Sequence, residues 1–395
     1  MRWSKWQEKF NNFRLPIADL RFTIHVSRIT MTITDKLLDL TIQIQQIPAP
    51  TFHEEARGKF VHDLFQKENL KDVSIDDVGN VYARMPGKNK KVKPLIVSAH
   101  LDTVFPNSIN LQSREEAGKV IAPGIGDNSL GVAALFGVAW SFHHRKIELE
   151  HDVWLVANVG EEGLGDLCGM RAVVDRFKDD VIGYLVLEGL ALGHIYHRAI
   201  GVKRYRIHAH TIGGHSWSDY GQPSAVHELA SLITKLTSLK LPREPRTTIN
   251  IGTISGGTGI NVLASDATCE LDLRSESPAT LEKIVAQAEE LIHSANRDGV
   301  KITTEVIGQR PAGEIPANHF FVQTAIDCMK QQGLEAVLIA GSTDANIPLS
   351  KGIPAVVMGI TTGGSAHTTH EYIKTEPIAK GIEGVVRFVE LIARE

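Results

Sequence analysis

The sequence predicts an α/β protein in which a mostly parallel sheet carries an inserted, ferredoxin-like α+β domain. First, apolar runs that end in polar residues and lead into helices recur over residues 94–188 and again after residue 311. Strands that alternate with helices in this way are typical of a parallel sheet covered on both faces. Second, residues 200–308 follow the order strand, helix, strand, strand, helix, strand, which is the ferredoxin-like order. Third, a chain of 395 residues is long for one core and suits two domains.

These patterns also predict the domain limits. Residues 31–199 and 309–395 form the two parts of the larger domain, residues 200–308 form the insertion, and residues 1–30 form an N-terminal appendage. The appendage is basic and lacks the continuous apolar run of a secretory signal. An arginine-rich targeting segment is the alternative interpretation of these thirty residues.

Local signals predict the elements before the sheet. A helical repeat of apolar residues begins at Thr32 and stops at the Pro48-Ala49-Pro50 segment. Thr51 and Glu54 have the spacing of a capping box, which predicts that a second helix begins there. Residues 73–85 are typical of a hairpin with a tight turn at Gly-Asn.

The later elements follow from apolar periodicity. In the larger domain the predicted strands are 94–99, 153–159, 184–187, 336–340 and 355–360, and the predicted helices are 130–142, 319–331 and one from about 377. In the insertion the predicted strands are 204–211, 247–254, 267–274 and 301–306, and the predicted helices are 225–236 and 280–295. The insertion is long enough to form its own core.

Composition and charge exclude several classes of function. A hydrophobic content of 43% and a charged content of 22% are those of a globular protein. The formal net charge of -4 gives no sign of a nucleic-acid partner, and no apolar run approaches the roughly 18 residues of a membrane span. The sequence has three cysteines, Cys168, Cys269 and Cys328, which are far apart and lack CxxC spacing. This pattern favours a reducing, cytoplasmic location, and it argues against a zinc site made of cysteines.

Two adjacent carboxylates, Glu161 and Glu162, follow the apolar strand 153–159. A carboxylate removed from water must be paired, hydrogen-bonded or bound to a metal. Gly160 and Gly163 flank the pair and allow a sharp turn, so the two side chains can point in different directions. One carboxylate can therefore bind a metal while the other handles a proton, although an isolated Glu-Glu pair is more often a solvated loop.

Other metal-binding residue types lie at the same edge of the predicted sheet. Ligands bind beyond the carboxyl ends of strands in open α/β sheets. His100, Asp102 and Glu188 fall at such ends, and His367 follows the strand that ends at residue 360. Asp127 lies in a loop just before a predicted helix. Mixed nitrogen and oxygen ligands suit zinc, with cobalt or manganese as alternatives. The His100-x-Asp102 spacing suggests that the carboxylate of Asp102 accepts the second ring N–H of His100.

Four segments together resemble a known family. They are Ser98–Val104 (SAHLDTV), Gly126–Gly131 (GDNSLG), Gly160–Gly163 (GEEG) and Ala366–Glu371 (AHTTHE). The chain from about Met31 to its end is similar to the dinuclear zinc exopeptidases and amidohydrolases, which include peptidase T, carboxypeptidase G, acetylornithine deacetylase and aminoacylase.

The resemblance implies a role for each matching residue. Asp127 would bridge two divalent metal ions, with His100 and Glu188 completing one site and Glu162 and His367 the other. Glu161 would be the general base and Asp102 the partner of His100. His370 competes with His367 as a ligand, and His367 is preferred because it stands four residues before Glu371, as in the family.

The resemblance also implies that the larger domain is catalytic and that the insertion is a lid that often dimerises. His215, in Gly-Gly-His-Ser, would stabilise the oxyanion, commonly in the neighbouring subunit. Asn261 and Arg274 would bind a substrate carboxylate, although Asn-Val-Leu-Ala replaces the usual Asn-Val-Ile-Pro at Asn261. Thr343 and Asp344 match a peptidase T-like loop near the site.

The sequence therefore predicts a metal-dependent hydrolase of amide bonds, with short peptides as substrates and a water activated by Glu161. An N-acyl amino acid deacylase is the nearest alternative, because both substrate classes present an amide close to a carboxylate. A metal-binding protein without turnover is a remote alternative. The expected partners are the substrate and a second copy bound through the insertion, without nucleic acid or membrane.

Overall fold

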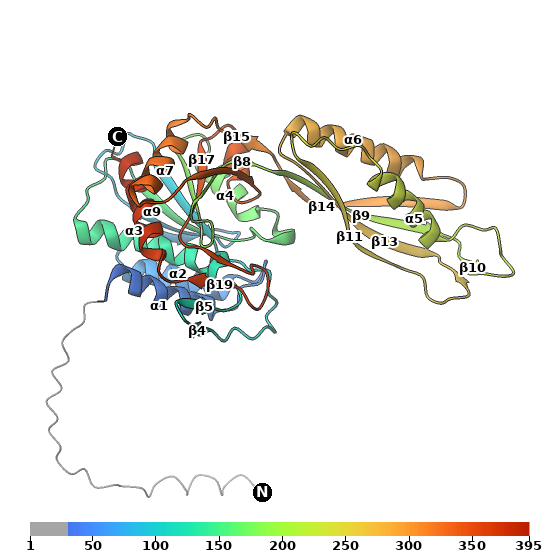
Figure 1. Cartoon of the computed structure of the whole chain (residues 1–395), viewed down its shortest axis with the longest axis horizontal. Coiled ribbons are helices and arrows are strands. Elements are labelled where there is room, and N and C mark those ends of the chain that lie inside the picture. The colour runs from blue at the N-terminus through green and yellow to red at the C-terminus, as the bar shows by residue number, and fades with distance from the viewer. Residues whose placement is uncertain (1–30, 395) are drawn as a thin grey trace, which may run out of the picture. The chain divides into compact units, whose positions relative to one another are not determined.

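A computed structural model describes residues 31–394 of the chain. The predicted appendage, residues 1–30, lies outside the described residues. The chain from Ile33 onwards forms one compact unit, and many of its elements are labelled in Figure 1.

The main sheet lies at the centre of the larger domain. In the described residues it has nine strands in the order β1-β2-β6-β3-β7-β17-β8-β15, with β16 also paired to β8. Its strands are β1 (Lys71–Ile75), β2 (Val81–Met85), β3 (Leu95–His100), β6 (Val153–Asn158), β7 (Gly183–Glu188), β8 (His194–Ala199), β15 (Gly313–Glu314), β16 (Val337–Gly341) and β17 (Ala355–Gly359). The central strands β6, β3, β7 and β17 are mutually parallel, while β2 and β8 flank them antiparallel. The predicted parallel centre and the predicted hairpin β1–β2 are both confirmed.

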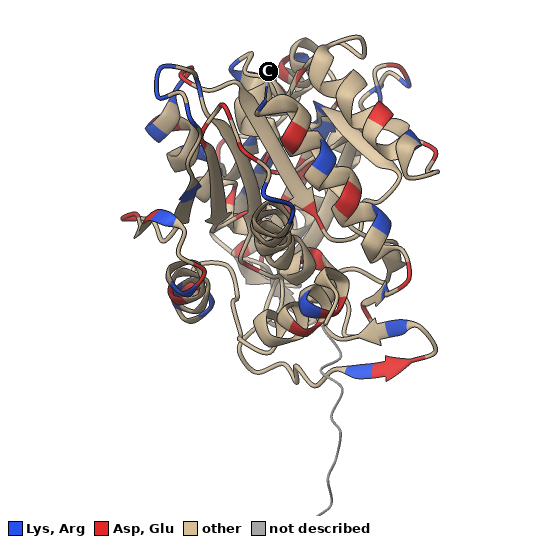
Figure 2. Ribbon diagram, turned by 90° about the vertical axis from the view of Figure 1, so that its left-hand side faces the viewer, with Lys and Arg blue, Asp and Glu red and all other residues tan. Residues whose placement is uncertain are grey.

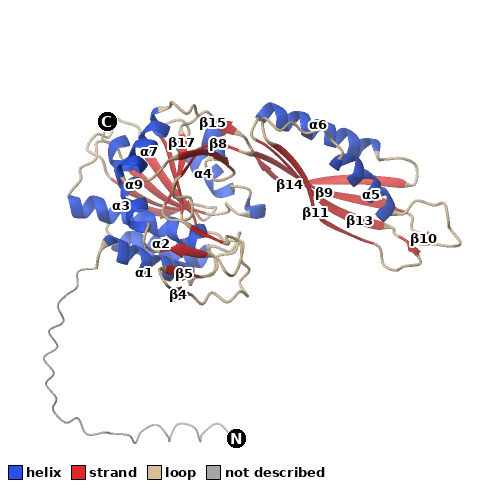
Figure 3. Ribbon diagram, viewed as in Figure 1, coloured by secondary structure: helices blue, strands red, loops and turns tan. Residues whose placement is uncertain are grey.

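Helices cover this sheet (Figure 3). They are α1 (Ile33–Gln45), α2 (Glu55–Lys67), α3 (Gly131–Arg145), α4 (Cys168–Phe177), α7 (Phe320–Gln331), α8 (Asn346–Ser350) and α9 (Ile378–Ile392). One apolar core joins them to the strands, and aromatic pairs such as Phe65–Phe136 and Phe321–Phe388 link helices within it. The buried strands explain the near-continuous apolar runs in the sequence.

The predicted capping box is wrong. The cap of α2 is Glu54, whose side chain makes no capping hydrogen bond. Instead Glu54 Oε1 accepts the backbone N–H of Gly160 at 3.1 Å, and the Thr51 hydroxyl donates to Asp102 Oδ2 at 3.0 Å. Thr51 and Glu54 therefore bond to the segments that carry Asp102 and the Glu pair, respectively, instead of capping the helix. These long-range hydrogen bonds replace the local ones that the capping pattern predicts.

The insertion has the predicted ferredoxin-like fold. Its elements are β9 (Gly201–Thr211), α5 (Ala225–Thr237), β11 (Thr247–Gly256), β13 (Asp266–Ser275), α6 (Pro278–Ser294) and β14 (Val300–Arg310). The antiparallel sheet has the order β11-β13-β9-β14, and α5 and α6 pack on it around a separate apolar core. At its tip, β10 (Gly214–His215) pairs with β12 (Val262–Leu263).

A small sheet that sequence patterns did not predict joins two distant parts of the larger domain. Its order is β18-β19-β5-β4, formed by β18 (Gly363–Gly364), β19 (Tyr372–Lys374), β5 (Lys119–Ile121) and β4 (Arg114–Glu116). The pairing of β19 with β5 brings the segment that carries His367 next to the segment that leads into Asp127. Two predicted ligands, 240 residues apart in the sequence, come together beside this contact.

The charged residues, the helix lengths and the cysteines complete the description of the fold. Acidic and basic residues are interspersed on the helices that face the viewer in Figure 2. Among the described residues, no helix has both the length and the apolar character needed to cross a membrane. All three cysteines lie in the described part of the chain and are free thiols.

Candidate active site

Most of the predicted site residues line one cavity of about 680 Å³ at the carboxyl ends of the central strands. Predicted residues that line it are His100, Asp127, Glu161, Glu162, Glu188, Arg274, Thr343 and His367. Arg204, Arg310, Ser342 and Tyr196 also line it and were not singled out from the sequence. The larger domain supplies the carboxylates and histidines, and the insertion's strands supply Arg204, Arg274 and Arg310.

Asp127 lies between two histidines. Its Oδ1 is 3.1 Å from Nε2 of His100, and its Oδ2 is 3.1 Å from Nε2 of His367. His100 Nε2 is also 3.8 Å from Glu188, and His367 Nε2 is 3.4 Å from Glu162. Each oxygen of the Asp127 carboxylate thus faces one histidine, and each of these histidines lies close to one further carboxylate. This arrangement is compatible with the predicted bridging role of Asp127.

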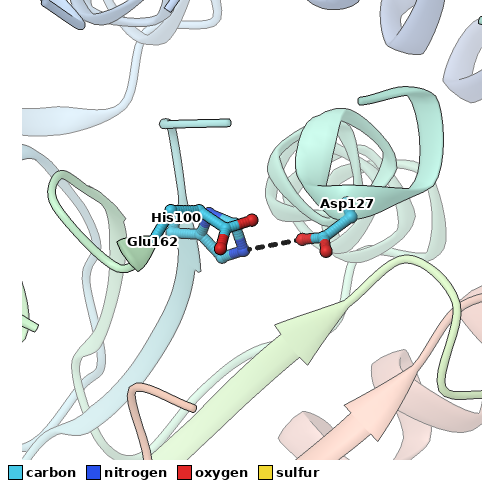
Figure 4. A group of neighbouring side chains, drawn as sticks. All are labelled: His100, Asp127 and Glu162. Carbon is cyan, nitrogen blue, oxygen red and sulfur yellow. Dashed lines mark ion pairs between the residues drawn. The ribbon is translucent and has the colours of Figure 1, made fainter. Parts of the chain in front are cut away.

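A single cation would fit within part of this group. One ligand atom each from His100, Asp127 and Glu162 lies within 4.8 Å of the others. Figure 4 shows these three side chains pointing toward one another from different segments. Their imidazole and carboxylate groups are ligands that zinc, cobalt and manganese accept.

The electrostatics of the cavity favour positive charge. Hydrogen bonds to Asp127 and Glu162 raise the pKa of His367 to about 10. Burial would lower the pKa of His100, yet its contacts with Asp102 and Asp127 raise it well above its usual value. Burial raises the pKa of Glu188 well above its usual value. Bound divalent cations would stabilise these crowded carboxylates, so the residues present fit a metal site.

Asp102 positions both His100 and the Glu pair. His100 Nδ1 is 3.1 Å from the backbone oxygen of Asp102 and 3.4 Å from its Oδ1. The same carboxylate accepts the backbone N–H groups of Glu161 at 3.0 Å and Glu162 at 2.8 Å. Asp102 therefore contacts a predicted ligand as expected, and it also orients the loop that carries the predicted base.

The Glu pair occupies the sharp turn expected from its flanking glycines. Gly160 and Gly163 have φ values of 65° and 49°, a region that side chains with a Cβ rarely adopt. A Cβ on Gly160 would also lie 2.3 Å from Cys168 Sγ. Glu161 and Glu162 are each 6% exposed. Burial raises the pKa of Glu161 to about 8, although the nearby Arg310 opposes the shift.

Glu371 orients the loop that carries Asp127. This fully buried carboxylate accepts backbone N–H groups from Gly124 at 3.1 Å, Gly126 at 2.7 Å and Asp127 at 2.8 Å. Burial raises the pKa of Glu371 to about 7, and these hydrogen bonds oppose the shift. In the sequence Glu371 only marked the spacing to His367, so its structural role was missed.

The geometry distinguishes the two competing histidines. His367 faces Asp127 and Glu162 from a left-handed backbone conformation with φ of 63°. Such strain costs roughly 1–3 kcal/mol and is typical of functional positions. Both histidines are exposed, but the ring of His370 forms no ion pair with a carboxylate within the described residues, and its backbone N–H donates to Thr368 Oγ1. The placement supports His367 as the ligand.

Four predicted residues do not line the cavity. Asp102 and Asp344 are both fully buried, and Asp344 Oδ2 accepts from Asn158 at 2.7 Å. Burial raises the pKa of Asp344 to about 6. His215 and Asn261 lie beside each other at the tip of the insertion, where Ser216 N donates to Asn261 O.

Comparison with known proteins identifies the family. Residues 96–391 match the family described as "Peptidase family M20/M25/M40". The chain belongs to this family. It is a metal-dependent peptidase or amidohydrolase, and the predicted family resemblance is confirmed.

Related proteins are similar in sequence to this chain over most of its length. A "Peptidase M20 domain-containing protein" of Schizosaccharomyces pombe is 28% identical over 319 residues, covering 78% of this chain and 72% of that protein. The protein YqjE of Bacillus subtilis is 23% identical over 374 residues, covering 91% of this chain and 99% of its own length.

Solved structures show the same fold. The aminopeptidase PepT of Bacillus cereus has a TM-score of 0.76 at 23% identity, covering 91% of this chain and 99% of that one. A tripeptidase of Staphylococcus aureus has a TM-score of 0.79 at 23% identity, covering 92% and 99%. A Bacillus subtilis protein described as a dinuclear metal-binding peptidase has a TM-score of 0.67 at 16% identity, covering 91% and 98%.

Gly189 provides a test of how tightly the Asp127 loop packs against β7. A Cβ on Gly189 would lie 2.0 Å from the backbone oxygen of Gly126. We expect Gly189→Ala to lower the stability by about 1–3 kcal/mol, because the loop must move, and to lower metal content with it. Thermal denaturation and metal analysis after desalting measure both effects.

Gly384→Ala in α9 is the matched control, since its Cβ would meet no atom closer than 3.9 Å. The control should keep the metal content of the wild type and match or slightly exceed its melting temperature, because alanine is favoured over glycine inside a helix. A Gly189→Ala protein that is indistinguishable from the control would contradict the tight packing.

Proposed function

We propose that the protein hydrolyses an amide bond in short peptides, with Glu161 as the general base. The observation that carries the proposal is the different surroundings of the two neighbouring carboxylates. Glu162 faces His367 at 3.4 Å, whereas Glu161 pairs with Arg310 and, within the described residues, forms no ion pair with a histidine. One carboxylate is thus oriented for a cation and its neighbour remains for proton transfer.

His100, Asp127 and Glu188 would bind one divalent ion, and Asp127, Glu162 and His367 would bind the other. Zinc suits these ligands, with cobalt or manganese as alternatives. When bound, the ions would polarise the amide carbonyl and lower the pKa of the attacking water. Glu161 accepts the proton of that water and delivers it to the leaving amine.

The arginines of the insertion support a substrate with a carboxylate. Arg274 lines the cavity, and its Nε donates to Asp272 Oδ2 at 2.7 Å. The other oxygen of Asp272 accepts from Arg204, also on the cavity wall, at 2.8 Å. Asp272 therefore orients two guanidinium groups, each with further N–H donors for a substrate carboxylate. Thr343 adds a hydroxyl to the same cavity.

We also propose that residues 31–199 and 309–395 act as the catalytic domain and residues 200–308 as a lid that forms a homodimer. His215 and Asn261 lie outside the cavity of their own chain, so their predicted roles require a second copy. Trp217 and Tyr220, next to His215, are 86% and 90% exposed and provide apolar area for such a contact. The three free thiols support a cytoplasmic location.

The experiment is amine release from a mixed panel of di- and tripeptides and N-acyl amino acids. Metal-loaded protein is compared with the same protein treated with a chelator. Chelator-sensitive cleavage of free peptides is the expected result, because peptide amides need both the cations and Glu161. Cleavage of N-acyl amino acids alone would overturn the peptidase assignment in favour of a deacylase, whose substrates present the same amide and carboxylate.

A further inference from the structure

Arg310 lies where the insertion rejoins the larger domain, at the last position of β14. Its guanidinium is part of the cavity wall, although the residue is only 6% exposed. A buried arginine is uncommon unless it is paired. The hydrogen-bond partners of Arg310 therefore indicate what this side chain does in the site.

The main partner of Arg310 is Glu161. Arg310 Nη1 is 3.0 Å from Glu161 Oε1, and Nη2 donates to the backbone oxygen of the same residue. Nη1 also donates to Ser342 Oγ at 3.2 Å. One planar guanidinium thus contacts both the side chain and the main chain of Glu161, which a lysine ammonium could not reproduce with the same geometry.

Glu161 is consequently oriented from two sides. Asp102 accepts its backbone N–H, and Arg310 contacts its backbone oxygen and Oε1. Within the described residues Oε2 receives no hydrogen bond, so this oxygen remains available toward the cavity. A proton acceptor needs one oxygen with a defined direction, and these contacts provide it.

The strand before Arg310 is attached to the larger domain by separate contacts. Gln309 N donates to Asp166 Oδ1 at 2.8 Å, and Arg171 Nη2 donates to Gln309 O at 2.6 Å. These hydrogen bonds position the end of β14, and none of them involves Glu161. They allow the effect of Arg310 on the base to be separated from its effect on the junction.

We propose that Arg310 is a positioning residue for Glu161, orienting the carboxylate so that Oε2 faces the reacting water. This role rests on the proposed function, in which Glu161 is the base. Arg310 acts through Glu161, from the strand that connects the insertion to the catalytic centre. A displacement of the lid would therefore move the partner of the base.

The kinetic test uses Arg310→Ala, with Arg171→Met as the matched junction control. We expect Arg310→Ala to lower kcat about 10²-fold, since misplacing a reacting group by about 1 Å can cost that much. KM and metal content should change little, and added guanidinium chloride should restore part of kcat, whereas potassium chloride should not. Arg171→Met should keep the wild-type kcat. A rise in KM at unchanged kcat, or a loss of kcat in both variants without rescue, would overturn the proposal.

A structural readout keeps the proposal independent of substrate choice. A crystal structure of metal-loaded Arg310→Met should show the Glu161 side chain in another rotamer or without a single position. An unchanged Glu161 conformation would overturn the positioning role even if no panel substrate were cleaved. Absence of turnover in the wild type, with Glu161 displaced in the variant, would instead count against the proposed function alone.

Discussion

Replacing Glu161 by glutamine is expected to lower kcat by about 10²–10⁴-fold while both metal ions stay bound. The carboxamide has nearly the same size and can still accept a hydrogen bond from Arg310 through its oxygen. It cannot take a proton from the attacking water at neutral pH, so only the proton-transfer step is lost. Steady-state kinetics and metal analysis of the desalted protein measure the two quantities.

Glu162→Gln is the matched control because it makes the same chemical change one residue away. Glu162 Oε1 is 3.4 Å from His367 Nε2, and one of its oxygens belongs to the group that could bind a cation. We expect this variant to lose metal first and activity as a consequence. If Glu161→Gln lost metal and Glu162→Gln kept it, the two roles would have to be exchanged.

Much of the fold could be predicted because it depends on periodic local patterns. The buried parallel strands produce apolar runs, and their polar ends identify His100, the Glu pair and Glu188 as neighbours. Strand β8 (His194–Ala199) escaped prediction because its residues do not alternate cleanly between polar and apolar: the burial alternates, but the buried face includes the polar His197. With polar residues on both faces, the segment lacks the apolar pattern from which the other strands were predicted.

The residues that orient the site were not predictable in the same way. Thr51, Arg310 and Glu371 each act through a hydrogen bond to a segment far away in the sequence. No periodicity or spacing encodes such a contact. Thr51 shows the difficulty most clearly, since its local capping pattern predicts a partner within three residues, whereas its actual partner Asp102 is 51 residues away.

The position of Asp127 illustrates how these long-range contacts create the bridge. Asn128 Nδ2 donates to Leu187 O at 2.8 Å, and its Oδ1 accepts from Gly189 N at 3.0 Å. These bonds attach the Asp127 loop to the end of β7, next to Glu188. On the other side, Glu371 attaches the loop to the segment that carries His367. The position of Asp127, the predicted bridging ligand, therefore depends on two separate sets of hydrogen bonds.

Glu371→Gln is expected to weaken metal binding about 10–100-fold, as is usual when a group that orients metal ligands is changed. Glu371 Oε1 accepts from Gly126 and Asp127, and Oε2 accepts from Gly124. In glutamine one oxygen becomes an NH₂ group that faces a backbone N–H donor. A buried donor left without an acceptor costs about 1–3 kcal/mol, so the loop should move and the melting temperature should fall.

Titration calorimetry with zinc on the chelated protein measures the affinity, and thermal denaturation of the same metal-free protein measures the stability. Glu376→Gln, five residues further along the chain, provides a control with the same substitution outside the set of hydrogen bonds to the Asp127 loop. We expect the control to match the wild type in both measurements. A Glu371→Gln protein with lower stability but unchanged zinc affinity would show that Glu371 supports the fold without orienting Asp127. Unchanged stability with lost affinity would instead place its effect on the bridge alone, because the metal-free loop would then tolerate the lost acceptor.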